Sequence, residues 1–305
     1  MTTQCYLNHM KYIKIFLILV TVVILSSCSK SQNEDMYSAS IQIKGSDTIV
    51  NLLQAWAEDF SQTRPLVNIG ITGGGSGTGF AALINRTCDI AMSSREIDSS
   101  EVELAKQKSV HPVEFMVGLD GLVILVNSKN PVEGLTLGQV KDIFTAKITN
   151  WKDVGGDDRP IVILSRESNS GTHKFFKEHV LRGGDKKDKT EFAPRSLLMP
   201  SSQAIYNEVL LNPNALGYVG MGYINDRVKA LKIAKDENSF SVYPDVYSVM
   251  ANTYPISRPL LLYTDGMPQG ALKDFIDFAL SPEGQAIVKE TDFVPLGTNT
   301  KMRQY

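Results

Sequence analysis

Short runs of β-branched and other apolar residues alternate with longer amphipathic segments from Ile41 onward. This alternation predicts an α/β protein, because strands and helices bury their apolar residues with different periods. The segments after Thr48, Ser76 and Ser170 are predicted helices, and Gly183 is placed to end the third of them. The predicted strands are Ile41–Lys44, Val67–Thr72, Asp89–Ser93, Gly121–Asn127, Ile161–Ser165 and Leu216–Val219.

Three motifs rich in Ser, Thr and Gly each lie between a predicted strand and a predicted helix. They are Gly45-Ser46-Asp47-Thr48, the run 73–79 (GGGSGTG) and Ser168-Asn169-Ser170-Gly171-Thr172. The first turn of a helix has unpaired N–H groups and a partial positive charge, so it can bind an anion. Glycine lets the backbone approach a ligand, and a hydroxyl adds a donor. One such motif is more often a helix cap, but three on one chain indicate an anion site.

Two arginines supply positive charge next to these motifs. Arg166 stands four residues before Ser170, and Arg95 follows Ser93-Ser94 at the end of a predicted strand. A guanidinium can bind two oxygens of a tetrahedral oxyanion at once. The alternative for either residue is an ordinary ion pair at the surface. The whole chain has 31 basic and 33 acidic residues, a net charge of −2, so it has no basic field for nucleic acid. A bound anion therefore needs a local site.

The chain does not match the residue spacing of any catalytic, cofactor-binding or metal-binding motif considered. The run 73–79 fits neither a dinucleotide-binding loop nor a P-loop, and the chain has no G-x-S-x-G elbow. The pair Ser170 and His173 lacks an evident orienting carboxylate, and the histidines after residue 100 lack metal-ligand spacing. We expect no catalytic residue, no metal and no cofactor. His173 is expected to be a partly exposed helix residue, and Cys88 a buried apolar side chain without a disulfide partner.

The N-terminal segment has the features of an export signal. Residues 13–25 form an apolar run that is too short for a comfortable bilayer span, with lysines before it and small residues after it. Leu25-Ser26-Ser27-Cys28 resembles a bacterial lipobox, after which Cys28 would be lipidated. We therefore expect residues 1–27 to be a lipoprotein signal peptide and residues 28–39 a lipidated tether. An uncleaved membrane anchor is the alternative, and Met10 is an alternative start to Met1.

Several motifs in order resemble the phosphate-binding proteins of ABC transporters, the PstS family. The resemblance lies in the three motifs above and in Asp89-Ile90-Ala91-Met92-Ser93-Ser94-Arg95, with Arg166 four residues before Ser170. Further similar segments are 135–144 (LTLGQVKDIF), 148–156 (ITNWKDVGG) and 254–260 (YPISRPL). The similarity extends from Ile41 to the C-terminus.

The resemblance implies a fold and a function. The fold would be that of a type II periplasmic binding protein, with two α/β lobes, two crossovers near 118–127 and 251–262, and a ligand cleft between the lobes. Lobe I would be residues 40–120 plus 260–305, and lobe II residues 121–259. The protein would bind inorganic phosphate outside the cytoplasmic membrane and deliver it to an ABC permease. It would be a monomer, attached to a bacterial membrane by its N-terminal lipid on the periplasmic or outer-surface side.

Alternatives to this function remain open at the sequence level. The chain could bind another tetraoxyanion, such as sulfate, molybdate or tungstate, or it could be a lipid-anchored sensor or adhesin that reuses the fold. A secreted phosphatase would need a metal cluster or an activated nucleophile, and the sequence shows neither.

The resemblance also implies a set of phosphate ligands. Carried over position by position, these are Thr48, Ser76, Arg166, Ser170, Gly171 and Thr172. Neighbouring residues of the motifs complete the predicted set: Ser46, Asp47, Ile49, Gly75, Ser94 and Arg95. Ile49 stands where the family often has an aromatic residue, so only its backbone N–H would contribute. Ser94 stands where some members have an aspartate that accepts the phosphate proton.

The chemistry of the anion indicates which residue would accept the phosphate proton. Phosphate near neutral pH carries a proton and sulfate does not, so one acceptor among many donors favours phosphate and repels sulfate. Asp47 is the candidate acceptor. It is expected to pair with Arg166 or Arg95, and a simple helix cap is the alternative role for it.

Overall fold

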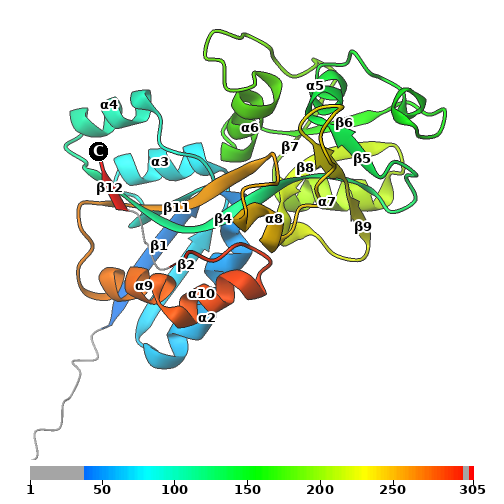
Figure 1. The fold of residues 1–305 in the computed structure, drawn as a ribbon. Coiled ribbons are helices and arrows are strands. Elements are labelled where there is room, and N and C mark those ends of the chain that lie inside the picture. The colour runs from blue at the N-terminus through cyan, green and yellow to red at the C-terminus, as the bar shows by residue number, and fades with distance from the viewer. Residues whose placement is uncertain (1–37, 298–301) are drawn as a thin grey trace, which may run out of the picture. The chain divides into compact units, whose positions relative to one another are not determined.

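A ten-stranded sheet organises the described part of the chain, residues 38–297 and 302–305, in the computed structural model (Figure 1). Strand β1 (Ala39–Gly45) lies between β2 (Val67–Thr72) and β3 (Ile90–Ser93) and is parallel to both. Strand β11 (Ser257–Asp265) runs antiparallel to β3 and to the long strand β4 (Pro112–Asn127). The first half of the sheet is therefore parallel until β11 reverses the direction.

The second half of the sheet continues from the same long strand. Strand β4 pairs antiparallel with β8 (Ala215–Gly220), which is parallel to β6 (Val162–Arg166), and β6 is parallel to β7 (Leu197–Met199). Strands β9 (Val228–Ala230) and β12 (Met302–Gln304) also pair with β4. A separate parallel pair is formed by β5 (Gly134–Thr136) and β10 (Lys232–Ala234).

Strand β4 changes partners along its length. Residues 112–121 pair with β11, and residues 122–126 pair with β8. Residues 122–126 (LVILV) are fully buried, as expected for a strand covered on both faces. Contacts group residues 38–305 into one compact unit, and β4 and β11 run side by side through it (Figure 1).

Helix α2 (Val50–Thr63) packs against helices from the end of the chain. It continues from the short turn η1 (Asp47–Ile49), and Leu52, Leu53, Trp56 and Phe60 form its buried face. The Trp56 indole donates to the Gly284 carbonyl in α10 (Pro282–Glu290) at 2.7 Å, and the Phe60 ring meets the Phe275 ring of α9 (Gly270–Leu280) edge-on at 5.4 Å. Figure 1 shows α9 and α10 beside α2.

The remaining helices connect the strands. They are α3 (Ser76–Ile84), α4 (Ser99–Gln107), α5 (Leu137–Phe144), α6 (Gly171–Phe176), α7 (Ser202–Leu211) and α8 (Val246–Met250), with short turns η2 (Trp151–Val154) and η4 (Met221–Tyr223). Helix α6 continues as a π-helical segment, η3 (Lys177–Leu181). The rings of Phe176, the last residue of α6, and Tyr218 are stacked 4.2 Å apart and join α6 to β8.

The mixed α/β class predicted from the alternation is confirmed, and each predicted strand has a counterpart. Strand β4 begins at Pro112, nine residues before the predicted start at Gly121. Strand β11 was not predicted, because Pro259 interrupts its apolar pattern and proline disfavours a central strand. Gly183 follows the end of η3 with a φ of +56°, a backbone conformation that suits glycine as a helix terminator.

The predicted signal peptide and Cys28 lie outside the described residues, as does nearly all of the tether. Among the helices of residues 38–297 and 302–305, none combines the length and the apolar character that a membrane crossing requires.

Candidate anion-binding site

The three Ser/Thr-Gly motifs meet at the carboxyl ends of parallel strands. Thr48 Oγ1, at the start of η1, lies 2.9 Å from Thr172 Oγ1 at the start of α6. Ser46 Oγ donates to Ser94 Oγ at 2.9 Å, and Ser94 N donates to Ser76 Oγ at 3.2 Å. All five side chains are almost completely buried. The fold therefore gathers hydroxyl groups from four segments into one cluster, at the edge of the sheet where ligands of α/β proteins bind.

Glycine makes the approach of α6 possible. A Cβ atom on Gly171 would clash with Ser76 Oγ and would lie 2.8 Å from Ser76 Cβ. Gly75 has a φ of +91°, and a Cβ atom there would lie 2.7 Å from the Asn169 carbonyl oxygen. Gly77 N donates to that same carbonyl at 3.0 Å. The glycines are therefore needed for close contact between two motifs that are far apart in sequence.

Four of the predicted ligand groups serve local structure as well. The Gly75 N–H donates to the Gly45 carbonyl at 2.8 Å, and the Ile49 N–H makes a long bond of 3.3 Å to the Ser46 carbonyl. Ser170 Oγ caps α6 by accepting from His173 N at 3.3 Å. Ser46 Oγ caps η1 by accepting from Thr48 N, also at 3.3 Å. Because Ser46 fills the cap position, the capping role considered for Asp47 is wrong.

Arg166 is 1% exposed and reaches this part of the structure through Asp47, the residue between Ser46 and Thr48. Its Nη2 donates to Asp47 Oδ2 at 2.6 Å and to the Pro200 carbonyl at 3.0 Å. Nη1 donates to Ser202 Oγ, and Nε donates to the Met199 carbonyl, both at 3.2 Å. Of the two arginines considered as partners of Asp47, the structure pairs it with Arg166. The guanidinium is thus fixed on several sides beside the hydroxyl cluster.

Arg95 is the predicted site residue that the structure directs elsewhere. Its Nη1 and Nη2 each donate to a different oxygen of Glu101 at 2.7 Å, and Nη1 lies 3.4 Å from Asp98 Oδ2. Both acids belong to the N-terminal end of α4, where Asp98 is the cap. The guanidinium is therefore neutralised by α4, and the expectation that it grips the anion together with Arg166 is not supported.

Sequence reasoning missed a second guanidinium in the cluster. Arg258 of β11 donates to Asp120 of β4 through Nε at 2.9 Å, and its Nη2 lies 2.8 Å from the same carboxylate oxygen. Nη1 donates to Thr172 Oγ1 at 3.1 Å, and Nη2 donates to Thr48 Oγ1 at 3.3 Å. Burial raises the pKa of Asp120, although the charge of Arg258 opposes this shift. The sequence did contain a sign of this pair: Asp120 is the one acidic residue in the otherwise apolar, glycine-containing run 117–122 (VGLDGL), and a buried carboxylate needs a charged or hydrogen-bonding partner.

His173 does not form a catalytic pair with Ser170. Its Nδ1 faces Ser165 Oγ at 3.3 Å, which in turn contacts the Tyr218 hydroxyl at 2.8 Å. The side chain is buried rather than partly exposed, because its ring packs 4.5 Å from the ring of Phe192. Burial, assisted by the charge of Lys177, lowers the pKa of His173 to about 4. The ring is therefore a neutral part of the core.

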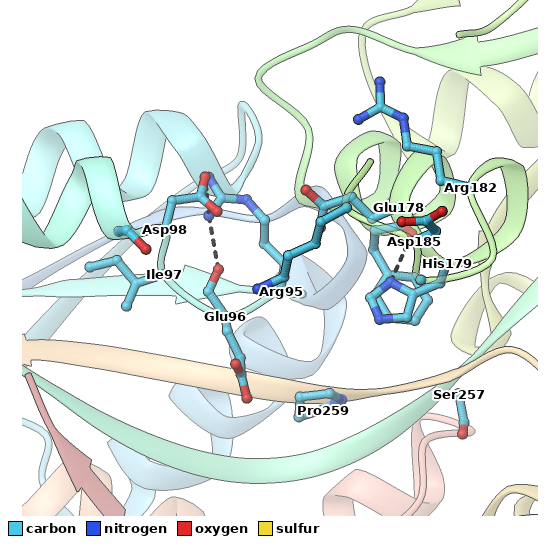
Figure 2. A pocket seen from close by; sticks show the side chains of 14 residues that line it. Arg95, Glu96, Ile97, Asp98, Glu178, His179, Arg182, Asp185, Ser257 and Pro259 are labelled. Carbon is cyan, nitrogen blue, oxygen red and sulfur yellow. Dashed lines mark hydrogen bonds and ion pairs between the residues drawn. The ribbon is translucent and has the colours of Figure 1, made fainter. Parts of the chain in front are cut away.

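Arg95, which follows Ser94 of the cluster in the sequence, lines a cavity of about 700 Å³. Figure 2 shows the side chains that line it. Arg95, Glu96 and Asp98 line one side of it, and Glu178, His179 and Arg182 line the other. Its lining also includes the two neighbours of Arg258 in β11 and the Phe175 ring, which lies 5.5 Å from the Arg258 guanidinium. The cavity is wide and has walls of both charges, so it does not match a single small oxyanion.

Within the described ranges 38–297 and 302–305, no group of three or more His, Cys, Asp or Glu residues could hold a metal ion. Cys88 is buried, as predicted, and burial raises the pKa of its thiol to about 12.

Comparison with known proteins places these features in a family. Residues 30–283 match the family described as a PBP superfamily domain. The chain is 34% identical over 276 residues to the phosphate-binding protein PstS of Pseudomonas aeruginosa, covering 85% of this chain and 84% of that protein. It is 30% identical over 273 residues to PstS of Bacillus subtilis, covering 89% and 85%.

Two solved structures are similar over most of the chain. One is a Clostridium perfringens chain described as a phosphate ABC transporter substrate-binding protein with bound phosphate. It is 35% identical with a TM-score of 0.75, and the match covers 85% of this chain and all (100%) of that one. The other is an ABC-type phosphate transport receptor of Vibrio cholerae, 32% identical with a TM-score of 0.64, covering 84% and 100%. The chain therefore belongs to the PBP superfamily and, within it, to the PstS family of phosphate ABC transporter substrate-binding proteins.

Proposed function

We propose that this protein binds inorganic phosphate outside the cytoplasmic membrane and delivers it to the permease of an ABC-type importer. The observation that carries the proposal is the convergence of hydroxyl groups from three helix-starting motifs next to the buried Arg166. Phosphate is also bound in the similar Clostridium perfringens structure. The protein acts as a binding protein rather than an enzyme, since its PstS relatives are named for phosphate binding.

The proposed ligand set follows the hydroxyl cluster. Phosphate oxygens would accept from hydroxyl or backbone groups of Ser46, Thr48, Ile49, Ser76 and Ser94, from those of Ser170, Gly171 and Thr172, and from the guanidinium of Arg166. Gly75 would shape the loop, because its N–H already makes a short 2.8 Å bond to the Gly45 carbonyl, whereas the Ile49 N–H makes only a long bond of 3.3 Å. Arg95 is left out of the set, because Glu101 and Asp98 hold its guanidinium at the start of α4, whereas the acidic partner of Arg166 is Asp47, itself a proposed ligand.

Asp47 is the proposed acceptor of the phosphate proton. Its Oδ2 lies 2.6 Å from Arg166 Nη2, and its Oδ1 accepts from Gly74 N at 3.1 Å. A carboxylate oxygen can accept more than one hydrogen bond, so each oxygen still has acceptor capacity. A carboxylate beside the anion would attract protonated phosphate and repel sulfate, which has no proton to donate.

The finer architecture that we propose has two lobes, residues 40–120 plus 260–305 and residues 121–259. The change of β4 partners between Gly121 and Leu122 supports a boundary there. In this arrangement the Thr48–Thr172 and Asp47–Arg166 contacts would join the two lobes, which supports a cleft in its closed form. Phosphate would favour the closed form, and the permease would recognise it.

The N-terminal features complete the proposal. Cys28, after removal of residues 1–27, would carry the lipid, and residues 28–39 would tether a monomeric receptor to a bacterial membrane. The test of this part is mass spectrometry of the membrane-bound protein. A lipidated N-terminal Cys28 is expected, and an intact N-terminus would contradict the proposal.

Calorimetric titration tests the substrate. A protein of residues 29–305, which contains the whole compact unit, is stripped of ligand and titrated with phosphate and then sulfate. The titrations are repeated across the pH range in which phosphate loses its second proton. Saturable phosphate binding is expected, with no response to sulfate. Arg166→Ala should abolish binding, Asp47→Asn should weaken the preference over sulfate, and the exposed control His111→Gln should bind as the wild type does.

Other outcomes would change the conclusion in defined ways. Tight binding of sulfate, molybdate or tungstate would keep the fold and replace the substrate. Absence of binding to every oxyanion would favour the surface sensor or adhesin.

A further inference from the structure

The pair Asp120 and Arg258 is held by the register of two strands. The residues lie directly opposite one another where β4 and β11 run antiparallel, and neither side chain has any exposed surface. Asp120 Oδ1 accepts from Met221 N at 2.9 Å, while Oδ2 accepts from Arg258. The carboxylate is therefore bound on both oxygens and holds one edge of the guanidinium.

The stability of the fold does not by itself explain a fully buried ion pair such as Asp120–Arg258. Removing two charges from water costs free energy that their mutual attraction often fails to recover, and apolar residues of similar size can do as well. The other edge of the guanidinium does not contact apolar core. It faces the hydroxyl cluster, where Nη1 donates to Thr172 Oγ1 and Nη2 donates to Thr48 Oγ1.

These two hydrogen bonds constrain the hydroxyl protons. A threonine hydroxyl has one proton to donate and two lone pairs that accept, whereas a guanidinium has only donors. An oxygen that accepts from Arg258 must point its own proton away from Arg258. Thr48 and Thr172 face each other at 2.9 Å, so one of the two protons is shared between them in this structure. An anion placed at these two oxygens would receive both protons.

We propose that Arg258 is a positioning residue of the phosphate site, held by Asp120, that turns the hydroxyl protons of Thr48 and Thr172 toward the bound anion. This inference rests on the proposed function, because it assigns a role within the same site. In this role Arg258 orients two hydroxyl donors, those of Thr48 and Thr172, while Arg166 would contact the anion directly. Because such donors are already oriented before binding, less free energy of binding is lost in ordering them.

Calorimetry on matched variants tests the role. Arg258→Lys keeps the charge but lacks the planar fork that reaches Asp120 and both threonines. It is expected to weaken phosphate binding about tenfold to a hundredfold, the range for losing hydrogen bonds to a charged group. Glu114→Gln is the control, because Glu114 is also buried and accepts from the hydroxyls of Tyr263 and Tyr305, away from the hydroxyl cluster. It should keep wild-type affinity even if it unfolds at a lower temperature.

A double-mutant cycle separates positioning from a merely structural role. Thr48→Val removes one hydroxyl at nearly constant shape. If Arg258 acts through that hydroxyl, Arg258→Lys should cost clearly less affinity in the Thr48→Val protein than in the wild type. Equal losses in the two backgrounds, or wild-type affinity in a folded Arg258→Lys protein, would overturn the inference. If Arg258→Lys fails to fold, the same cycle is made with Asp120→Asn, which releases the guanidinium from its anchor.

The wild-type titration distinguishes the inference from the function on which it rests. If the wild type binds sulfate or molybdate instead of phosphate, the proposed substrate fails, and the cycle is measured with the anion that binds. If the wild type binds no oxyanion, the inference fails together with the proposed function.

Discussion

Acidification should destabilise this protein through His173, which the fold buries in its neutral form. The residue is only 8% exposed, and its ring lies between the ring of Phe192 and the hydroxyl of Ser165. Burial, with the nearby charge of Lys177, lowers its pKa from 6.5 to about 4. A group whose pKa differs between the folded and unfolded states makes the free energy of unfolding depend on pH.

The sign and size of the effect follow from proton binding in the two states. The unfolded imidazole binds a proton below pH 6.5, whereas the folded one stays neutral until the pH approaches about 4. The unfolded state therefore binds more protons in this window, and the free energy of unfolding falls as the pH is lowered through it. Since one pKa unit is worth about 1.4 kcal/mol, the loss is roughly 2 kcal/mol at pH 5 and about 3 kcal/mol in all.

Urea unfolding of residues 29–305 at a series of pH values measures this loss. His173→Gln removes the titrating group, so it should lower stability near pH 7 but flatten the pH dependence between pH 7 and pH 4 by about 3 kcal/mol. His111→Gln changes an exposed histidine and should leave the profile unchanged. Carboxylates that titrate in the same range contribute equally to all three proteins. Parallel profiles for the wild type and His173→Gln would refute the reasoning.

Three further results are expected. Gly171→Ala should weaken phosphate binding at least tenfold in calorimetry, because the added Cβ lies 2.8 Å from Ser76 Cβ; unchanged affinity would show that the close approach is not needed. Arg166→Lys should lower the urea-unfolding free energy by about 1–3 kcal/mol through lost hydrogen bonds to Asp47 and its other partners. It should also remove the stabilisation by added phosphate, so a variant stabilised as much as the wild type would contradict the site. Cys88, with its thiol pKa raised to about 12 by burial, should react with a thiol reagent only after unfolding; rapid labelling of the folded protein would be inconsistent with this burial.

Local features of the fold and site were predictable from the sequence. Strands such as Val67–Thr72 and the buried face of α2 follow from the spacing of apolar residues, which depends only on the period of each element. The position of Ser170 at the start of α6, four residues after Arg166, is likewise local. Because parallel strands place their carboxyl ends at one edge of the sheet, the meeting of the three motifs was also predictable in outline.

The partners of charged groups depended on tertiary structure. Arg95 follows β3 closely and Arg166 ends β6, yet Glu101 neutralises the first and Asp47 pairs with the second. His173 was expected to be partly exposed on its helix, but Phe192 packs against its ring. Sequence periodicity describes one element at a time, so it carries no information on which remote side chain covers or neutralises a group.

Asp120 and Arg258 show this limit most clearly. They are 138 residues apart, and only the antiparallel register of β4 and β11 sets them opposite each other below the threonine hydroxyls. The sequence by itself determined the α/β class, the helix starts and the residue types suited to an oxyanion. The tertiary structure decided which arginines reach that site, because charge pairing in a buried site depends on distances of a few ångströms between segments that no local pattern relates.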